Sequence, residues 1–399
     1  MATHNVRRLT IGVSALALAA PLAVAAAGAA GATPARLAPR PPGHVVVVAG
    51  LNNPRQLSLV DNAELLIAEA GKGGTIPAGA DPESGDATFA GATASVSAVL
   101  APQLARNQSP RRVITGLISV AGQDGSAATG ADGVSALNRR SPIYVQLTDI
   151  PAGVLPASLE RSQNGKLIQA RPYGRTSVVA DISGFEARHD PDRHGVESNP
   201  YAVLAQPNRL LVADAAANDV LSIDRRGRVT VLHVFGNITD GACAAQQDPP
   251  GFAGCNFVPT SLATDRWGNI YVGALGSLVP NEGRVVKLDP SGRRMLRTWT
   301  GLTAVTGLAV AGNGDLYVSQ LFAPEAAPIN PAVQGVLTKI SANGRRTNVD
   351  VPFPTGVELD RWGNVYVSAF SIAPSTGLAD PTSGAVVPGT SGQVWRLRF

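Results

Sequence analysis

The chain has 399 residues, of which 44% are hydrophobic and 16% are charged, so it can bury a large core. Its 43 glycines and 30 prolines interrupt long helices and mark turns, which favours short strands. The formal net charge of +4 is too small for a chain of this length to indicate a nucleic-acid partner.

The N-terminal segment predicts export. Arg7 and Arg8 precede an acid-free run of small apolar residues, which is the pattern of a secretory signal peptide. We expect a signal peptide over residues 1–32, a linker over 33–43 and a secreted mature protein. The alternative is an uncleaved membrane anchor, and the arginine pair leaves Sec and twin-arginine export open. Cleavage removes two arginines, which lowers the net charge from +4 to +2. No later apolar run reaches the roughly 18 residues that span a membrane.

One hairpin pattern recurs along the rest of the chain. Its clearest copies are DRWGNIYVGAL (265–275) and DRWGNVYVSAF (360–370). In each copy Asp can accept hydrogen bonds from turn amides, Gly can adopt positive φ, and a β-branched and aromatic strand follows. The residues at the tyrosine position of the six copies are Leu66, Tyr144, Leu211, Tyr271, Tyr317 and Tyr366.

Each hairpin is followed by a loop and a second pair of strands, as in GRVVKLDPSGRRMLRTW (283–299). Repeated four-stranded units are the blades of a β-propeller. The last copy ends with SGQVWRLRF, a third strand, and GHVVVVAGL (43–51) matches the missing fourth strand. We therefore predict an all-β fold, a six-bladed β-propeller over 44–399 whose N-terminal strand completes the last blade. An open solenoid would need capping segments, and we see none in the sequence.

Two insertions interrupt the repeats. Residues 71–95 extend the first blade, and residues 237–258 contain both cysteines, Cys243 and Cys255. In an exported protein an isolated pair predicts one disulfide, whereas a metal pair or reactive thiols would need neighbouring ligands that the sequence lacks. Both insertions are rich in Gly, Pro and small polar residues, as excursions on a ring face should be.

Candidate binding residues lie where the inner strands begin, at one mouth of the expected central channel. Asn, Asp and Thr recur there, and such residues bond local backbone and start strands, so a structural role is the default expectation. The functional alternative is a ring of neutral groups that faces a small polar ligand. The predicted ligand-binding residues are Asn53, Arg55, Asp132, Glu197, Asn199, Thr260, Thr306 and Thr355.

The richest polar stretch is FEARHDPDRHGVESNPY (185–201). Dense carboxylates and imidazoles could bind a divalent metal such as calcium or polarise a water, although a solvated loop with Pro and Gly turns is the main alternative. Glu197 and Asn199 are the candidate metal ligands because they lie nearest the strand start. The chain has no G-x-S-x-G, H-E-x-x-H or P-loop motif, so we assign no catalytic residue.

The D-x-x-G-N-[IV]-Y-V hairpins and the six-fold count resemble the TolB-like six-bladed propellers, near their NHL-type and gluconolactonase-like (SMP-30-like) branches. The GFEA…ESNPY passage and the terminal SGQVWRLRF resemble the ScyD/ScyE family more closely, over roughly residues 44–399. The gluconolactonase-like branch implies a divalent metal at the channel mouth, held by a first-blade Glu and by Asn and Asp from later blades. Here Asn53 stands where that acid is expected, and only Asn199 and Asp132 match in type.

Three functions follow from these observations. The first is a monomeric, non-catalytic exported propeller that binds a small polar molecule, a glycan or a protein at the channel mouth. The second is a metal-dependent hydrolase or lactonase that uses Glu197, Asn199 and Asp132. The third is a scaffold whose insertions, 71–95 and 237–258, recruit a partner. We prefer the first, since the sequence offers no catalytic set.

Overall fold

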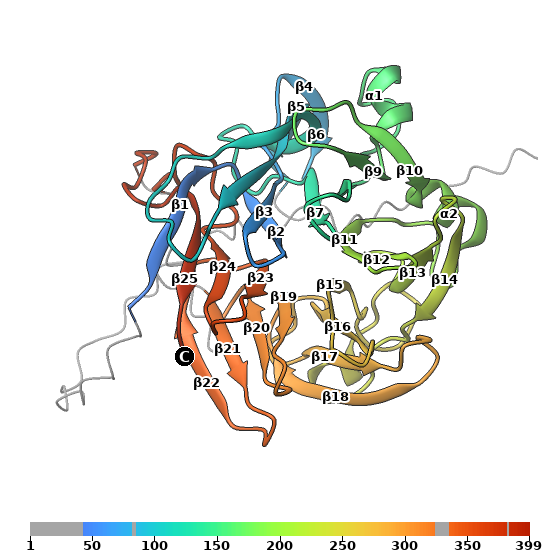
Figure 1. Ribbon diagram of the computed structural model, residues 1–399. Coiled ribbons are helices and arrows are strands. Elements are labelled where there is room, and N and C mark those ends of the chain that lie inside the picture. Colours follow the sequence, from blue (N-terminus) through green and yellow to red (C-terminus); the bar gives the residue numbers. More distant parts are fainter. Residues whose placement is uncertain (1–42, 82–84, 324–334, 381–382) are drawn as a thin grey trace, which may run out of the picture.

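The computed structural model describes residues 43–81, 85–323, 335–380 and 383–399. The expected signal peptide and nearly all of the linker lie outside these residues, so export and cleavage stay predictions. The described chain forms six antiparallel sheets arranged around a central axis (Figure 1). The predicted six-bladed β-propeller is thereby confirmed.

Each blade consists of four strands, and the first blade carries one more, β4 (Ile76–Ala80), in its insertion. From the inner to the outer strand, blade 1 consists of β2 (Pro54–Val60), β3 (Glu64–Glu69), β5 (Ala87–Leu100) and β6 (Arg112–Gly122); blade 2 of β7 (Ala131–Ser135), β8 (Ile143–Leu147), β9 (Lys166–Ala170) and β10 (Ser177–Asp181); blade 3 of β11 (Pro200–Ala205), β12 (Leu210–Asp214), β13 (Asp219–Ile223) and β14 (Val229–Val234); blade 4 of β15 (Pro259–Thr264), β16 (Ile270–Ala274), β17 (Gly283–Leu288) and β18 (Met295–Leu302); blade 5 of β19 (Val305–Val310), β20 (Leu316–Gln320), β21 (Val336–Ile340) and β22 (Arg346–Asp350); and blade 6 of β23 (Val357–Leu359), β24 (Val365–Ala369), β25 (Gly392–Leu397) and β1 (Val45–Leu51).

Helices are short and lie between blades or strands. They are α1 (Ala157–Ser162), α2 (Ile182–His189) and the 3₁₀ helix η1 (Gly241–Ala245). The repeat pattern does not predict α2, although Asp181 is a good N-cap residue and its side chain accepts a hydrogen bond from the Gly184 amide. Among the described residues, none of the helices has the length and apolar character that a membrane crossing requires.

The hairpin turns have the chemistry that the repeated motif predicts. Asp265 Oδ1 accepts hydrogen bonds from the amides of Trp267 and Asn269, each at 3.0 Å. The glycine between them, Gly268, has φ of +80°, which a residue with a Cβ adopts only with strain. The copy at Asp360 repeats the geometry, with both amide contacts at 2.9 Å. In each motif the aspartate therefore stabilises the hairpin turn.

The ring closes between the N- and C-terminal strands. β1 pairs antiparallel with β25, with Val46 opposite Trp395 and Val48 opposite Val394. Figure 1 shows the two strands side by side, β1 in blue and β25 in red. The predicted closure is confirmed. It pairs one edge of β25 and so removes a free sheet edge inside the last blade.

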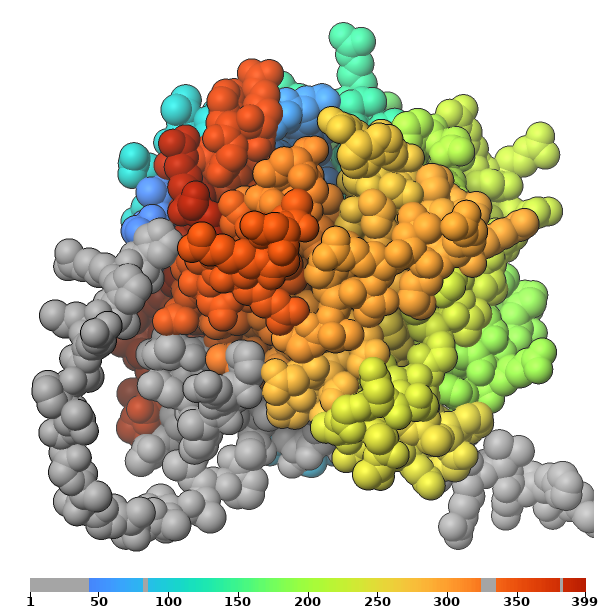
Figure 2. All heavy atoms as spheres, turned by 90° about the horizontal axis from the view of Figure 1, so that it is seen from below, coloured from blue at the N-terminus to red at the C-terminus, as the bar shows by residue number. Residues whose placement is uncertain are grey.

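The same topology sorts the connections onto two faces. In a four-stranded meander the turns after the first and third strands leave at one end of the sheet, and the other connections leave at the opposite end. Contacts between turns of neighbouring blades bear this out, because Arg209 Nη2 donates to the Pro290 carbonyl at 2.7 Å and the Arg361 amide donates to Asn62 Oδ1 at 2.8 Å. We call these two sides the hairpin-turn face and the loop face. Figure 2 shows the ring edge-on, with the outer strands of blades 4 and 5 (orange) toward the viewer.

The insertion between blades 3 and 4 contains the predicted disulfide. Cys243 and Cys255 are bonded to each other, and both are buried. Ile238 exchanges two backbone hydrogen bonds with Cys255, at 2.8 and 2.9 Å. The insertion is therefore a cross-linked element fixed to the ring.

We expect Leu51→Ala to lower the free energy of unfolding by about 2–5 kcal/mol, because truncating a buried leucine leaves a cavity in the closing strand. Leu51 is fully buried in β1, opposite Gly392. Leu296→Ala is the control, since Leu296 is 43% exposed on the outer strand β18 and should cost less than about 0.5 kcal/mol. Chemical denaturation of the two variants checks this, and equal losses would contradict the importance of closure.

Candidate functional site

Three threonines at the predicted channel mouth connect neighbouring blades. Thr260 Oγ1 donates to the Val305 carbonyl at 2.6 Å, Thr306 Oγ1 to the Pro354 carbonyl at 2.8 Å, and Thr355 Oγ1 to the Pro54 carbonyl at 3.0 Å. Each acceptor lies at or just before the inner strand of the next blade. All three threonines are at most 3% exposed. These predicted residues therefore hold the ring together.

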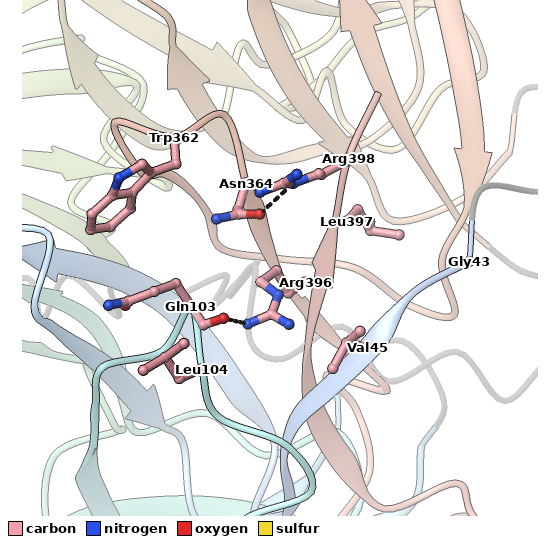
Figure 3. A pocket seen from close by; sticks show the side chains of 9 residues that line it. All are labelled: Gly43, Val45, Gln103, Leu104, Trp362, Asn364, Arg396, Leu397 and Arg398. Atoms are coloured by element: carbon pink, nitrogen blue, oxygen red, sulfur yellow. Dashed lines mark hydrogen bonds between the residues drawn. The ribbon is translucent and has the colours of Figure 1, made fainter.

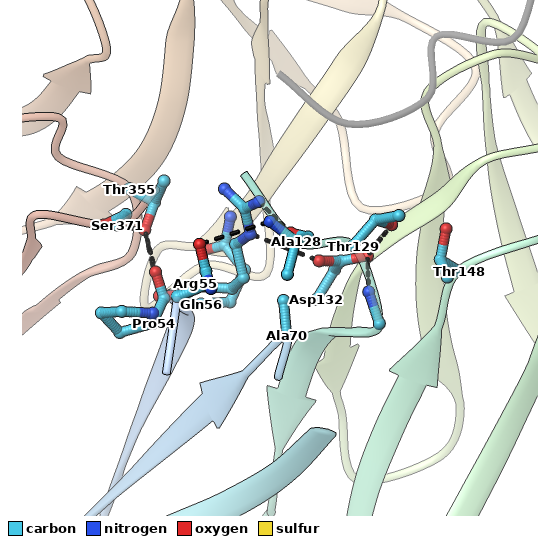
Figure 4. A network of polar contacts seen from close by, with 12 residues as sticks. Pro54, Arg55, Gln56, Ala70, Ala128, Thr129, Asp132, Thr148, Thr355 and Ser371 are labelled. Carbon is cyan, nitrogen blue, oxygen red and sulfur yellow. Dashed lines mark hydrogen bonds and ion pairs between the residues drawn. The ribbon is translucent and has the colours of Figure 1, made fainter. Parts of the chain in front are cut away.

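The predicted residues of blades 1 and 2 form a second buried network (Figure 4). Asn53 Nδ2 donates to the carbonyls of Gly71 at 2.7 Å and Gly125 at 2.9 Å. Arg55 Nε lies 3.4 Å from Asp132 Oδ1, and Arg55 Nη2 donates to the Ala128 carbonyl. Asn53, Arg55 and Asp132 are each at most 1% exposed.

This network contains buried polar atoms that the described chain does not satisfy. Arg55 Nη1 and the Tyr201 hydroxyl have no hydrogen-bond partner. Burial raises the pKa of Tyr201 to about 12. Burial also raises the pKa of Asp132, and the neighbouring Arg55 guanidinium opposes that shift. Breaking the Arg55–Asp132 pair would leave a charge in the protein interior.

Two loops cover this network at the channel mouth. The Asn53 amide donates to the Ala373 carbonyl at 2.7 Å, and the Ala127 amide donates to the Ile372 carbonyl at 2.8 Å. The first- and last-blade loops thus meet over the mouth. A ligand in solution does not reach the Asn53, Arg55 and Asp132 side chains in this arrangement.

Gln56 crosses the channel beneath this network. Its Nε2 donates to the carbonyls of Thr260 at 3.1 Å and Thr306 at 2.7 Å, on blades 4 and 5. Toward the hairpin-turn face lies a cavity of about 260 Å³, lined by the inner strands of all six blades. Within the described chain, Glu358 is the only ionisable residue in that lining, and burial raises the pKa of its carboxyl from 4.5 to about 7.

The predicted metal ligands lie beside blade 3. The Asn199 amide donates to Asp214 Oδ1 at 2.7 Å, and Thr148 Oγ1 lies 3.5 Å from Asn199 Oδ1. Both Glu197 and Asn199 are partly exposed. The carboxylates that the described structure gathers closely are Glu186, Asp190 and Asp192, and Glu197 is not among them. A ligand role for Glu197 and Asn199 stays a prediction.

The two faces of the ring have opposite charge. Within the described chain, the connections on the hairpin-turn face contain fifteen arginines, no lysine and six aspartates. The connections on the loop face contain thirteen carboxylates and four cations. The fifteen arginines are Arg106, Arg111, Arg139, Arg140, Arg171, Arg175, Arg209, Arg225, Arg226, Arg228, Arg266, Arg293, Arg294, Arg345 and Arg361. This charge separation was not predicted from the sequence, although its signal is present in repeated turns such as LNRR (137–140), DRRGR (224–228), SGRR (291–294) and NGRR (343–346).

Two exposed tryptophans stand among these arginines. Trp267 and Trp362 are 60% and 46% exposed. The guanidinium carbons of Arg266 and Arg361 lie 4.2 and 4.5 Å from the respective ring centroids. Each indole therefore presents a flat apolar surface to solvent, with a positive charge beside it.

A pocket of about 430 Å³ opens beside Trp362, at the seam where β1 meets β25 (Figure 3). Arg396 and Arg398 line it together with the amides of Gln103 and Asn364. Arg398 Nε donates to Asn364 Oδ1 at 2.8 Å, and Arg396 Nη1 donates to the Gln103 carbonyl. Neither arginine forms an ion pair with a carboxylate of the described chain. The pocket therefore has a positive charge and an aromatic wall.

Comparisons with known proteins add little about activity. No protein-family model matches the chain. No curated protein matches it either.

Solved structures match over most of the chain. A streptogramin B lyase is 9% identical over 89% of this chain and 96% of its own, with a TM-score of 0.47. A protein from Thermus thermophilus, provisionally assigned as an oxidoreductase of the glucose dehydrogenase type, is 18% identical over 89% and 99%, with a TM-score of 0.47. A protein provisionally assigned as a gluconolactonase is 12% identical over 90% and 93%, also at 0.47. At such identities and scores the likeness concerns the fold and carries no argument about function.

We expect Arg55→Met to lower the free energy of unfolding by about 3–5 kcal/mol, because it leaves the Asp132 carboxylate buried without its partner. Arg55→Met combined with Asp132→Leu should recover most of that loss, since the uncompensated charge is then gone. Denaturant titration of both variants measures this. A double variant no more stable than the single one would contradict the pairing.

Glu358 should make stability depend on pH. Its pKa is raised in the folded state to about 7 from 4.5, so the unfolded chain releases this proton first as pH rises. The contribution of Glu358 to the free energy of unfolding is therefore fully present below about pH 4.5 and is lost as the pH rises through about 7. Glu358→Gln should flatten the fall in the denaturation midpoint between pH 4.5 and 7. An unchanged pH profile would show that the carboxyl titrates normally.

Proposed function

We propose that the protein is an exported, non-catalytic binding protein that holds an acidic glycan on its hairpin-turn face. The observation that carries this proposal is the collection of fifteen turn arginines against six aspartates on one side of the ring. Export rests on the predicted signal peptide, and the disulfide between Cys243 and Cys255 is consistent with it. Membership of the ScyD/ScyE family is part of the same proposal.

The chemistry of the face favours an acidic glycan over other anions. A guanidinium binds a carboxylate through two parallel hydrogen bonds, so spaced arginines suit a chain of uronic acids. An exposed indole packs on the apolar face of a sugar ring, and Trp267 and Trp362 offer two such surfaces. The side-chain amide of Gln103 in the seam pocket suits a sugar hydroxyl.

The burial of the residues at the strand starts supports binding on the hairpin-turn face and not at the channel mouth. A lactonase would need substrate and metal at the channel mouth, close to Asp132 and Asn199. Asp132 is 1% exposed and paired with Arg55 beneath two loops. The scaffold alternative concerns the insertions on the loop face. It assigns no role to the arginines of the hairpin-turn face.

We expect the exported, purified protein to bind polygalacturonate at low salt and not to bind dextran, as measured by isothermal titration calorimetry. Binding should weaken steeply as salt rises, because exposed charges are screened beyond about 8 Å at physiological ionic strength. Trp362→Ala, and separately Arg361→Gln with Arg398→Gln, should each lower the affinity about fivefold to tenfold.

The matched control is Arg188→Gln with Arg193→Gln, which removes two exposed arginines from the loop face and should leave the affinity unchanged. Equal losses in the two double variants would mean that only net charge matters and would overturn the assigned face. Tighter binding to duplex DNA or to anionic phosphatidylglycerol vesicles than to polygalacturonate would overturn the glycan. No binding to any polyanion would overturn the whole proposal.

A further inference from the structure

Three carboxylates converge on the loop face, ahead of the inner strand of blade 3. Glu186 comes from α2, Asp190 caps the C-terminus of that helix, and Asp192 follows in the loop. One oxygen from each lies within 4.8 Å of the others. The turn that brings them together depends on Asp190, which adopts a left-handed conformation with φ of 40°. The cluster is therefore built by the end of one short helix.

Buried carboxylate oxygens without partners belong to Glu186, a member of this cluster, and to Asp219, whose chain neighbour Asn218 bonds to Asp192. Glu186 Oε1 and both carboxylate oxygens of Asp219 have no hydrogen-bond partner, and each residue is 1% exposed. Unsatisfied carboxylate oxygens are costly in a protein interior, so their presence indicates a missing electrophilic partner. This is independent of the proximity of the three acids.

No cationic side chain compensates for the charge. None of Glu186, Asp190, Asp192 and Asp219 pairs with a lysine or arginine of the described chain, and Asp192 has only His194, at 3.5 Å from its Oδ2. The group is thus destabilised by its own charge.

We propose that Glu186, Asp190 and Asp192 bind a calcium ion, with Asp219 supplying further negative charge behind them. Calcium accepts oxygen ligands in irregular geometry, whereas magnesium needs a near-ideal octahedron. The oxygen-only set also argues against zinc, which prefers nitrogen and sulfur ligands. This site differs from the predicted pair, Glu197 and Asn199, and is independent of the glycan proposal.

The site connects to the disulfide-bonded insertion through Asn218. Its Nδ2 donates to Asp192 Oδ2 at 2.9 Å and to Asn256 Oδ1 at 3.0 Å, while its Oδ1 accepts from the Val258 amide at 3.0 Å. The His194 and Phe252 rings also meet, with centroids 4.1 Å apart. Calcium would therefore fix the loop over 190–199 against the insertion over 237–258.

Calorimetric titration of purified, EDTA-dialysed protein tests the proposal. We expect one calcium per chain, and a melting temperature that rises by about 3–6 °C at saturation. Glu186→Gln with Asp192→Asn should lower the calcium affinity at least tenfold. The metal-free variant should be at least as stable as the metal-free wild type, because two repelling charges are gone. A purely structural role for the carboxylates would instead destabilise it.

Asp124→Asn is the control, since Asp124 is an exposed loop-face carboxylate of blade 1 and should keep the full calcium response. No calcium binding by the wild type, equal loss in the control, or equal binding of magnesium would each overturn the proposal. If the double variant does not fold, limited proteolysis of the wild-type protein tests the calcium site instead. Calcium should protect residues 190–199 from cleavage and EDTA should remove the protection, and cleavage insensitive to both would overturn the site.

Discussion

The pairing of β1 with β25 is the constraint on which the rest of the molecule depends. It joins the two ends of the described chain in one sheet and fixes the number of blades around the axis. Because the ring is closed, the inner strands stand close enough for hydroxyls such as Thr306 Oγ1 to reach the carbonyl of the next blade. The polar residues at the strand starts thus bond to the neighbouring blade. They stabilise the interfaces between blades, where no sheet hydrogen bonds form.

Closure of the ring also determines on which face each charged side chain lies. Every blade runs in the same sense around the axis, so the connections after the first and third strands lie on one face and the remaining connections lie on the other. Arginine is frequent in the turns, where aspartates such as Asp265 and Asp360 are already occupied by turn amides. Acids accumulate in the connections of the other face. The result is a molecule whose small net charge conceals two faces of opposite sign.

The two faces differ in how their charge is tolerated. On the hairpin-turn face the guanidinium groups are spread over several turns and exposed to water, so their repulsion is screened. Beside blade 3 the carboxylates are buried and adjacent, which is unfavourable without a counter-charge. Such a cluster persists because the surrounding structure over-determines it, through α2, the strands of blade 3 and the cross-linked insertion. Uncompensated buried charge of this kind indicates a ligand site more clearly than the channel does, because loops cover the channel mouth.

The sequence alone determined the repeat, the closure and the disulfide, because each depends on local chemistry or on simple counting. The D-x-x-G-N turns specify hairpins by side-chain bonding within five residues, and a missing fourth strand at one terminus demands a match at the other. Only the tertiary structure decided what the polar residues do. Thr260, Thr306 and Thr355 became links between blades because their acceptors lie some 45 residues away or, for Thr355, at the far end of the chain. The acid cluster needed the same information, since its link to blade 3 is the bond from Asn218 to Asp192, two residues that lie 26 positions apart in the sequence.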